Sequence, residues 1–370
     1  MDKKMKILYF APIYFDDMKQ RPQQIAELIA QNHEIYYIEP TISLMRQILK
    51  GGLKSAGKKV KVDEGLHIIR LNGFCTIHKS LEIYDFLGIN SISEVLQLRK
   101  LVKHCDLIWV GYSGWYTVVR HFVNKTIIFD KMDEEELLVS SKSLKLTLKR
   151  NMKNMIKISD FIIVTCQKFY KDILSLGKPV ELIPNAVSKG FSQNIKKSVV
   201  SYAPINNINR IGYIGTIGEW FDYNVIETIL EINLTCEIIL VGKNFLPKLD
   251  NPRLKYIGVK KNEDLPDIIQ TFDLCLYNFK SMPLLDTINP VKIYEYLSMN
   301  IPVLAIKSME TIVLKDYLLL YEDKDDIISV LNGVITRPFA NEDARMKFIN
   351  NNSWDVRVKQ ISKIIDKLEE

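Results

Sequence analysis

The chain has 370 residues, of which 47% are hydrophobic and 25% are charged, enough for two domains with ordinary cores. No run of 18 uncharged apolar residues occurs, which excludes a spanning helix, and residues 1–6 lead into an apolar segment without a signal-peptide cleavage pattern. The five cysteines and five histidines lack metal-ligand spacing, which argues against a metal site and predicts reduced thiols in a cytosolic protein.

The net charge of +6 is unevenly distributed. Residues 1–190 carry 29 Lys and Arg against 20 Asp and Glu, whereas the remaining residues carry 21 against 24. A basic first half predicts an anionic partner, either a membrane surface or a phosphorylated acceptor. Nucleic acid is not expected, because no recognition motif accompanies the charge.

Strand-like apolar runs alternate with helical patterns along the whole chain, which predicts an α/β fold with parallel sheets. In the first half we expect helices that include 23–31 and 92–104 and strands at 6–11, 33–38, 67–71, 107–110, 126–130, 161–165 and 180–183. In the second half we expect strands at 210–214, 237–241, 254–257, 274–276, 303–306 and 317–320. The polar segment between the halves has no periodicity and is read as a linker.

The predicted organisation is therefore an N-terminal Rossmann-like domain at 1–187, a linker at 188–208, a C-terminal Rossmann-like domain at 209–350 and a terminal helix at 351–370. Apolar residues keep helical spacing in this last segment, and Ser353 is its expected N-cap.

A glycine-containing loop, IGYIGTIGEWFDY at 211–223, follows the first strand of the second half. Gly215 and Gly218 allow close backbone approach to a phosphate, and Thr216 adds a hydroxyl group. The alternative is a tight strand–helix turn in which Asp222 caps the helix.

The strand that ends in ILVGKN, 239–244, places Gly242 and Lys243 where ligands of open α/β sheets lie. Lys243 can reach a phosphate there. A solvated surface lysine is the alternative.

The segment DTINPVKIYEYLSMNIPVLA, 286–305, is the most informative part of the chain. Asn289, Pro290 and Lys292 lie at the start of a predicted helix, 293–299, whose free N–H groups and dipole suit a diphosphate. Glu295 can accept two hydroxyl hydrogen bonds, as a ribose diol requires. The alternative is an ordinary αβ unit with Pro290 at the first helical position and Asn300 as a C-cap.

Residues 289–305 resemble the donor-binding segment of GT-B glycosyltransferases, especially the family-4-like enzymes of bacterial capsule, teichuronic acid and exopolysaccharide synthesis. The resemblance implies two Rossmann-like domains that face a central cleft, with a C-terminal helix that packs back toward the first domain. It also implies metal-independent transfer of a sugar from a nucleotide-diphosphate donor, the co-substrate, to a glycan acceptor, which we expect to be lipid-linked. No further cofactor is expected.

The resemblance extends to single residues. In that group the Glu of the EYL element holds the ribose, and the corresponding residue in this chain is Glu295. A loop like 256–266 holds the base through the backbone around Val259. Many members carry a second Glu that faces the donor sugar. This chain has Thr287 there, beside Asp286, so the sugar and the stereochemical outcome stay open.

Carboxylates cluster at the end of a first-half strand in IIFDKMDEEEL, 127–137. Glycosyl transfer needs a base for the acceptor hydroxyl proton, and similar enzymes carry a comparable Asp-x-x-Asp element. Asp133 is therefore the candidate base and Asp130 its support. The alternative is that Asp133–Glu136 cap the basic helix that follows.

The loop after the first strand, 11–28, is also expected to face the cleft. Arg21 and Gln24 are candidates for holding an acceptor or a phosphate there, with Pro22 as a simple helix-start residue in the alternative.

Two basic amphipathic segments, 41–61 and 141–157, have the composition that favours anionic lipid. A charged outer face over a core-packed helix is the alternative for both. With the missing signal peptide, they predict a cytoplasmic protein that is peripheral at the inner membrane face.

Metal binding at Asp323-Lys-Asp325 is not expected, because helix capping explains this Asp-x-Asp better.

Two rival functions are kept. One is a non-hydrolysing nucleotide-sugar 2-epimerase of the same architecture, although its histidine and carboxylate pattern is not evident. The other is a non-catalytic nucleotide-sugar-binding subunit, which the absent second Glu favours.

Overall fold

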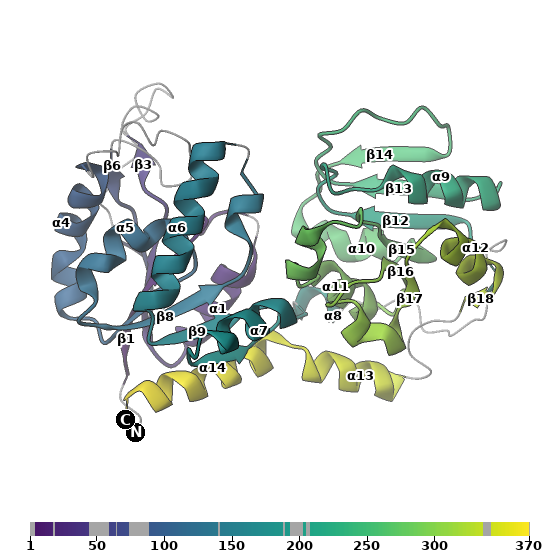
Figure 1. Ribbon diagram of the computed structural model, residues 1–370. Helices are drawn as coiled ribbons and strands as arrows, with labels where there is room; N and C mark the ends of the chain where they lie inside the picture. The colour runs from purple at the N-terminus through teal and green to yellow at the C-terminus, as the bar shows by residue number, and fades with distance from the viewer. Residues whose placement is uncertain are drawn as a thin grey trace. The chain divides into compact units, whose positions relative to one another are not determined.

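The computed structural model describes residues 4–17, 19–43, 59–63, 65–73, 89–139, 141–187, 189–192, 203–204, 208–335 and 342–369. The chain forms two compact units (Figure 1). Unit 1 comprises Met1–Ile183 and Val358–Glu370, and unit 2 comprises Pro184–Arg357. The chain thus enters unit 2 at Pro184, three residues before the predicted domain end at 187, and it re-enters unit 1 within the terminal helix. Most of the predicted linker, 188–208, lies outside the described residues.

Unit 1 is built on an eight-stranded sheet with the order β10-β9-β8-β7-β1-β2-β5-β4. Its strands are β1 (Lys6–Phe10), β2 (Glu34–Ile38), β4 (Lys59–Asp63), β5 (Leu66–Ile69), β7 (Leu107–Val110), β8 (Thr126–Lys131), β9 (Phe161–Val164) and β10 (Val180–Leu182). All pairings are parallel except that of β4 with β5. The edge strand β4 was not predicted. A separate pair joins β3 (Ile42–Ser43) and β6 (Asn72–Gly73).

The helices of unit 1 are α1 (Arg21–Ile29), α4 (Ile89–Lys103), α5 (Tyr116–Val119), α6 (Lys142–Ile158), α7 (Gln167–Ser175) and most of α14 (Trp354–Glu369), with short 3-10 turns η1 (Ser113–Trp115), η2 (Arg120–Phe122) and η3 (Glu135–Leu137). Ser353 precedes α14, and its hydroxyl accepts a hydrogen bond from Val356 N at 3.4 Å. The predicted cap is therefore present.

Unit 2 contains a six-stranded, fully parallel sheet with the order β14-β13-β12-β15-β16-β17. Its strands are β12 (Arg210–Ile214), β13 (Glu237–Val241), β14 (Leu254–Gly258), β15 (Leu274–Tyr277), β16 (Val303–Ile306) and β17 (Leu319–Tyr321). A small antiparallel pair joins β11 (Ala203–Pro204) and β18 (Val334–Ile335).

The helices of unit 2 are α8 (Lys189–Ser192), α9 (Tyr223–Ile232), α10 (Leu265–Ile269), α11 (Val291–Ser298), α12 (Lys324–Asn332) and α13 (Glu342–Asn351), with the turns η5 (Asn262–Asp264), η6 (Pro283–Thr287) and η7 (Ile312–Tyr317). The predicted strand 317–320 is displaced to β17 because η7 extends through Tyr317. Strands β12, β15 and β16 are buried almost throughout, as expected for a parallel sheet covered on both faces. The predicted α/β plan of two Rossmann-like units is confirmed.

None of the helices in the described ranges combines the length and the hydropathy that crossing a lipid bilayer requires. The described cysteines, at positions 105, 166, 236 and 275, are buried free thiols.

Gly212 provides a test of packing in unit 2. A Cβ atom at this position would lie 2.1 Å from the ring of the fully buried Phe272. We expect Gly212→Ala to lower the free energy of unfolding by about 1–3 kcal/mol, the usual cost of overpacking. Gly190→Ala is the control, because a Cβ there meets nothing within 4 Å. Urea denaturation measures both, and equal stability of the two variants would contradict this packing.

Candidate functional site

Two glycines bring the loops after β12 and β13 into direct backbone contact. Gly242 has φ of +141°, and a Cβ atom there would lie 2.0 Å from the carbonyl oxygen of Gly215. Gly215 N donates to Val241 O at 2.9 Å, and Ile217 N donates to Lys243 O at 2.9 Å. A side chain at 242 would separate the loops, so they form one glycine-lined shelf at the carboxyl edge of the sheet. Ligands of open α/β sheets bind at this edge.

The loop after β12 is anchored at its far end as well. Asp222 N donates to Asn278 O at 2.9 Å, and Asn278 Nδ2 donates to Asp222 O at 3.0 Å. The Asp222 carboxylate accepts from Asn224 N at 3.0 Å and caps α9, as the alternative interpretation of this loop predicted. Thr216 is exposed. Asn278 is fully buried just after β15, and no motif in the sequence identified it.

Two further predicted donor-binding residues, Lys243 and Val259, lie along the same edge. Lys243 is exposed, and its Nζ lies 4.6 Å from the ring centroid of Phe245. Gly258 O accepts from Gly242 N at 2.9 Å, which joins the end of β14 to the shelf. Val259, the next residue, is 63% exposed. Phe245 is equally exposed, although no sequence motif pointed to it.

Helix α11 carries the two residues with the most specific predictions. It begins at Val291 after Pro290 as N-cap, two residues before the predicted start. Lys292 Nζ and Glu295 Oε2 form an ion pair at 2.8 Å, with Lys292 29% and Glu295 6% exposed in their side chains. The lysine therefore compensates a carboxylate that is almost fully buried.

A phenol fixes α11 to the glycine-lined shelf. The fully buried Tyr296 accepts a hydrogen bond from Ile214 N at 2.8 Å, directly before Gly215. Burial strongly raises the pKa of the Tyr296 phenol, so this group stays neutral. The resemblance predicts a ribose contact for Glu295, whereas nothing in the sequence indicated that the neighbouring Tyr296 positions the helix.

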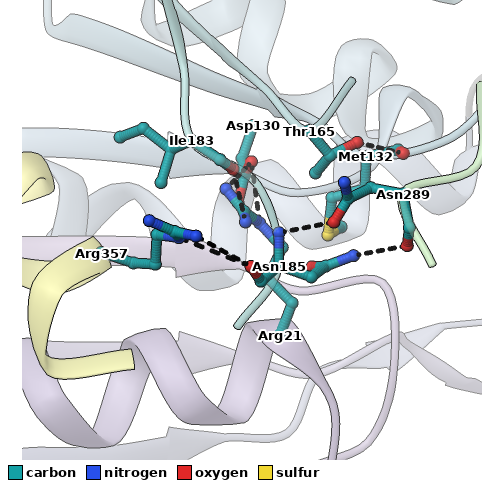
Figure 2. A network of polar contacts seen from close by, with 8 residues as sticks. All are labelled: Arg21, Asp130, Met132, Thr165, Ile183, Asn185, Asn289 and Arg357. Atoms are coloured by element: carbon teal, nitrogen blue, oxygen red, sulfur yellow. Dashed lines mark hydrogen bonds and ion pairs between the residues drawn. The ribbon is translucent and has the colours of Figure 1, made fainter. Parts of the chain in front are cut away.

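Asn289 is engaged by the loop that leads into unit 2 (Figure 2). Its Oδ1 accepts from Asn185 N at 2.9 Å, its backbone oxygen accepts from Asn185 Nδ2 at 3.1 Å, and its Nδ2 donates to Glu310 at 2.9 Å. Arg357 donates in turn to Asn185 O, at 3.4 Å from Nε. This geometry gives Asn289 a positioning role ahead of α11.

The residues in place of the family's second Glu are bound locally. Thr287 is 2% exposed, and its hydroxyl donates to Leu284 O at 2.7 Å within η6. Asp286 accepts from Met309 N at 3.0 Å. Asp323 caps α12 by accepting from Asp326 N at 2.9 Å, as predicted for the Asp-x-Asp segment.

In unit 1, two predicted site residues bind each other (Figure 2). Arg21 Nε donates to both carboxylate oxygens of Asp130, at 3.2 and 3.0 Å, and Nη2 donates to Oδ1 at 3.0 Å. Arg21 Nη1 also donates to Ile183 O at 2.9 Å. Both side chains are buried, so the pair joins the start of α1 to the end of β8. Gln24, one turn later in α1, is half-buried.

Asp133 lies after β8 with an exposed side chain, and its backbone oxygen accepts from Lys131 Nζ at 3.1 Å. Desolvation by the surrounding protein raises the pKa of Asp133. The negative charges of Asp130 and Glu134 raise this pKa further, whereas the positive charges of Lys131 and Arg21 lower it. Because an exposed carboxylate keeps much of its hydration, position at the strand end is the stronger argument for Asp133.

The capping alternative for this cluster is wrong. Helix α6 begins at Lys142, and Ser141 is its N-cap, with Oγ accepting from Leu144 N at 3.3 Å. The carboxylates 133–136 precede η3 or lie in it, several residues upstream of α6. A hydroxyl next to the first turn satisfies the free N–H groups more directly than a distant carboxylate does.

Glu135 is a buried carboxyl that the sequence did not distinguish from its neighbours. It accepts hydrogen bonds from Ser113 N at 2.9 Å and from the Ser113 hydroxyl. Burial raises its pKa to about 8, although the bonds from Ser113 lower it. Glu135 therefore holds η3 against the loop after β7.

Comparisons with known proteins identify the architecture. No family model matches the sequence, and no curated protein matches it. A sucrose-phosphate synthase from Thermosynechococcus elongatus has a TM-score of 0.66 at 14% identity, over 99% of both chains. Anabaena HepE in complex with UDP has a TM-score of 0.62 at 11% identity, over 99% of this chain and 100% of that one.

A third structure, the lipopolysaccharide outer core galactosyltransferase WaaB in its apo form, has a TM-score of 0.60 at 13% identity. The alignment covers 98% of this chain and 99% of the WaaB chain. At such low identities the similarity establishes the fold alone, and that fold is the GT-B architecture of two Rossmann-like domains.

The buried Glu135 predicts a pH effect on stability. Its folded pKa exceeds the unfolded value of about 4.3, so between about pH 5 and 8 the folded state keeps a proton that the unfolded state has lost. The free energy of unfolding should therefore fall as pH rises through this window. Glu135→Gln mimics the protonated group and should flatten this dependence by on the order of a few kcal/mol. Urea titrations of the full chain at several pH values measure it, with the exposed Glu181→Gln as control. A slope unchanged by Glu135→Gln contradicts the assignment.

Proposed function

We propose that this chain is a glycosyltransferase that moves a sugar from a nucleotide-diphosphate donor to a glycan acceptor. The observation that carries the proposal is the arrangement at the carboxyl edge of unit 2. There a glycine-lined shelf lies at the end of β12, and the phenol of Tyr296 joins this strand end to α11, the helix that carries the Lys292–Glu295 ion pair. The GT-B architecture supports the same conclusion.

Each part of this edge matches a part of the donor. The backbone of Gly215 and the hydroxyl of Thr216 accommodate the diphosphate, because a glycine leaves room for oxygen atoms to approach. Lys292 neutralises phosphate charge at the start of α11, and Lys243 adds a second cation. Glu295 accepts the ribose hydroxyls, and the backbone around Val259 contacts the base.

The reaction follows from these assignments. The acceptor oxygen bonds to the anomeric carbon, the bond from that carbon to the phosphate oxygen breaks, and the nucleoside diphosphate departs with the electron pair. Asp133 receives the proton of the acceptor hydroxyl. Lys292, the shelf and the start of α11 stabilise the developing charge, so we propose transfer without a metal or another cofactor.

The acceptor is the least constrained partner. We propose a lipid-linked glycan in surface polysaccharide synthesis, used by a cytoplasmic protein at the anionic inner face of the membrane. The basic first half of the chain supports an anionic surface. The similarity to WaaB, a lipopolysaccharide outer core galactosyltransferase, supports a surface glycan. The HepE structure contains UDP, which makes UDP the first nucleotide to test.

One observation favours a second candidate, a non-catalytic nucleotide-sugar-binding subunit. Thr287 occupies the place of a carboxylate, and its hydroxyl is bound within η6. Such a subunit would bind the donor without turnover, which activity measurements distinguish.

Ligand fragments test the assignments on α11. Uridine carries the ribose alone, whereas UDP carries the ribose and the diphosphate. Glu295→Ala should weaken both at least about tenfold, because charge-assisted hydrogen bonds contribute about 1.5–3 kcal/mol each. Lys292→Ala should weaken UDP by a similar factor and weaken uridine less than UDP. Isothermal titration calorimetry measures all four constants.

The control is the exposed ion pair of Lys324 and Glu231, which has the same 2.8 Å separation in the same unit. Lys324→Ala and Glu231→Ala should leave both affinities unchanged. Equal losses of uridine and UDP in Lys292→Ala would contradict its role at the diphosphate, and unchanged affinities in Glu295→Ala would remove the ribose assignment.

Asp133→Asn tests the proposed base. Turnover should fall by about 10²–10⁴-fold, the usual contribution of a positioned base, with UDP affinity and melting temperature nearly unchanged. Glu134→Gln is the control, because this neighbour forms an ion pair with Lys131 at 3.5 Å and should retain most turnover. If Asp133→Asn retained near wild-type turnover, another group would have to accept the proton.

A further inference from the structure

One helical layer of unit 1 is unusual in its charge. Helices α4 and α6 both contact α5, which lies between them (Figure 1). Apolar residues of all three helices share one core with β1, β7 and β8. Their opposite sides face solvent. We call the solvent side of α4, α5, η2 and α6 the basic–aliphatic face.

Acidic residues are almost missing from these elements. In α4, α5, η2 and α6 the sole Asp or Glu is Glu94, which is 1% exposed. Ten lysines and arginines are exposed there, at positions 99, 100, 103, 120, 142, 145, 149, 150, 153 and 157. Most helical surfaces of soluble proteins mix both signs of charge. On this face the exposed charged residues of α4, η2 and α6 are cations alone.

Large aliphatic side chains protrude among these cations. Ile92 and Leu96 of α4 are each 56% exposed, and Leu146 of α6 is 71% exposed. Beside this face, Leu137 and Leu138 at the end of η3 are 48% and 56% exposed; η3 contacts α6 and also carries Glu135 and Glu136. Exposed aliphatic groups ringed by basic residues are characteristic of surfaces that insert shallowly into a lipid headgroup region.

We propose that the basic–aliphatic face docks on an anionic lipid bilayer. Cations complement the phosphate-bearing headgroups, while the leucines and isoleucines lose contact with water by entering the interface. Nucleic acid would complement the charge but offers nothing to the aliphatic side chains. Docking through this face would bring the acceptor site of the proposed transferase to a lipid-linked glycan. Only this biological role, and not the docking itself, rests on the proposed function.

The structure also revises where membrane contact is expected. Of the two predicted segments, 41–61 lies mostly outside the described residues, whereas 141–157 is α6. The face extends beyond that segment to α4 and η2, whose basic residues gave no amphipathic signal when the sequence was read alone.

Vesicle cosedimentation without donor or acceptor tests the docking. Phosphatidylcholine vesicles are compared with vesicles of three parts phosphatidylcholine to one part phosphatidylglycerol. The protein should bind the second kind and be released by salt. Replacing Lys145, Lys149 and Lys153 together by Ser should weaken binding roughly 100-fold, because each cation near the surface contributes roughly a fivefold factor.

The chain offers a matched control. Lys359, Lys363 and Lys367 of α14 have the same spacing and are also exposed, but Asp355 and Asp366 lie on the same helix. Their triple replacement by Ser removes equal charge and should leave vesicle binding within about twofold of wild type. Leu138→Ser with Leu146→Ser should weaken binding to anionic vesicles while preserving its salt dependence.

Three outcomes would overturn the proposal. They are no binding to anionic vesicles, equal losses in the two lysine triples, and binding to a DNA or RNA oligonucleotide that depends on the α6 lysines but not on the leucines. Calorimetry with UDP on the same preparations separates the two hypotheses. UDP binding without vesicle binding would contradict only the docking surface. Vesicle binding without UDP binding would contradict only the proposed transferase function.

Discussion

The close approach of Gly215 and Gly242 is the constraint on which the unit 2 site depends. With a Cβ position only 2.0 Å from the facing carbonyl oxygen, no side chain fits at 242 while the loops stay joined. Their contact sets the position of the shelf and continues through Gly258 to the residue expected at the base. Helix α11 depends on the same region, since Tyr296 accepts its hydrogen bond from Ile214, the residue before Gly215. The phosphate, ribose and base assignments therefore share one rigid frame.

Unit 1 uses a buried ion pair for a comparable purpose. Arg21 and Asp130 hold the start of α1 against the end of β8, and a broken buried pair is costly because one charge is left uncompensated. Asp133 follows three residues later and is exposed between the half-buried Met132 and Glu134. A fixed strand end followed by an accessible carboxylate is a suitable arrangement for a base, since the pair fixes the backbone and the side chain still reaches solvent.

Periodicity in the sequence was enough to predict the parallel strands, and β7, β12, β13 and β16 begin and end where the apolar runs do. It could not predict that Arg21 and Asp130 would bind each other, because 109 positions separate them and only the folded sheet brings them together. Glu135 and Asp133 look alike in a run of four carboxylates. In the structure Glu135 is buried and hydrogen-bonded to Ser113, whereas Asp133 is exposed. Similarly, the partners of Asn289, Asn185 and Glu310, lie 104 and 21 positions away in the sequence. Local pattern thus indicates elements and edges, whereas the roles of polar side chains depend on distant partners.

The path of the chain between the units affects synthesis on the ribosome. Unit 2 is a continuous segment, Pro184–Arg357, whereas unit 1 is completed by Val358–Glu370, including the fully buried Ile361 and Ile365. Unit 2 can therefore reach its native state while unit 1 still lacks its last helix. During translation unit 1 would leave the ribosome first and mature last, with the apolar surface that α14 covers exposed to chaperones in the meantime.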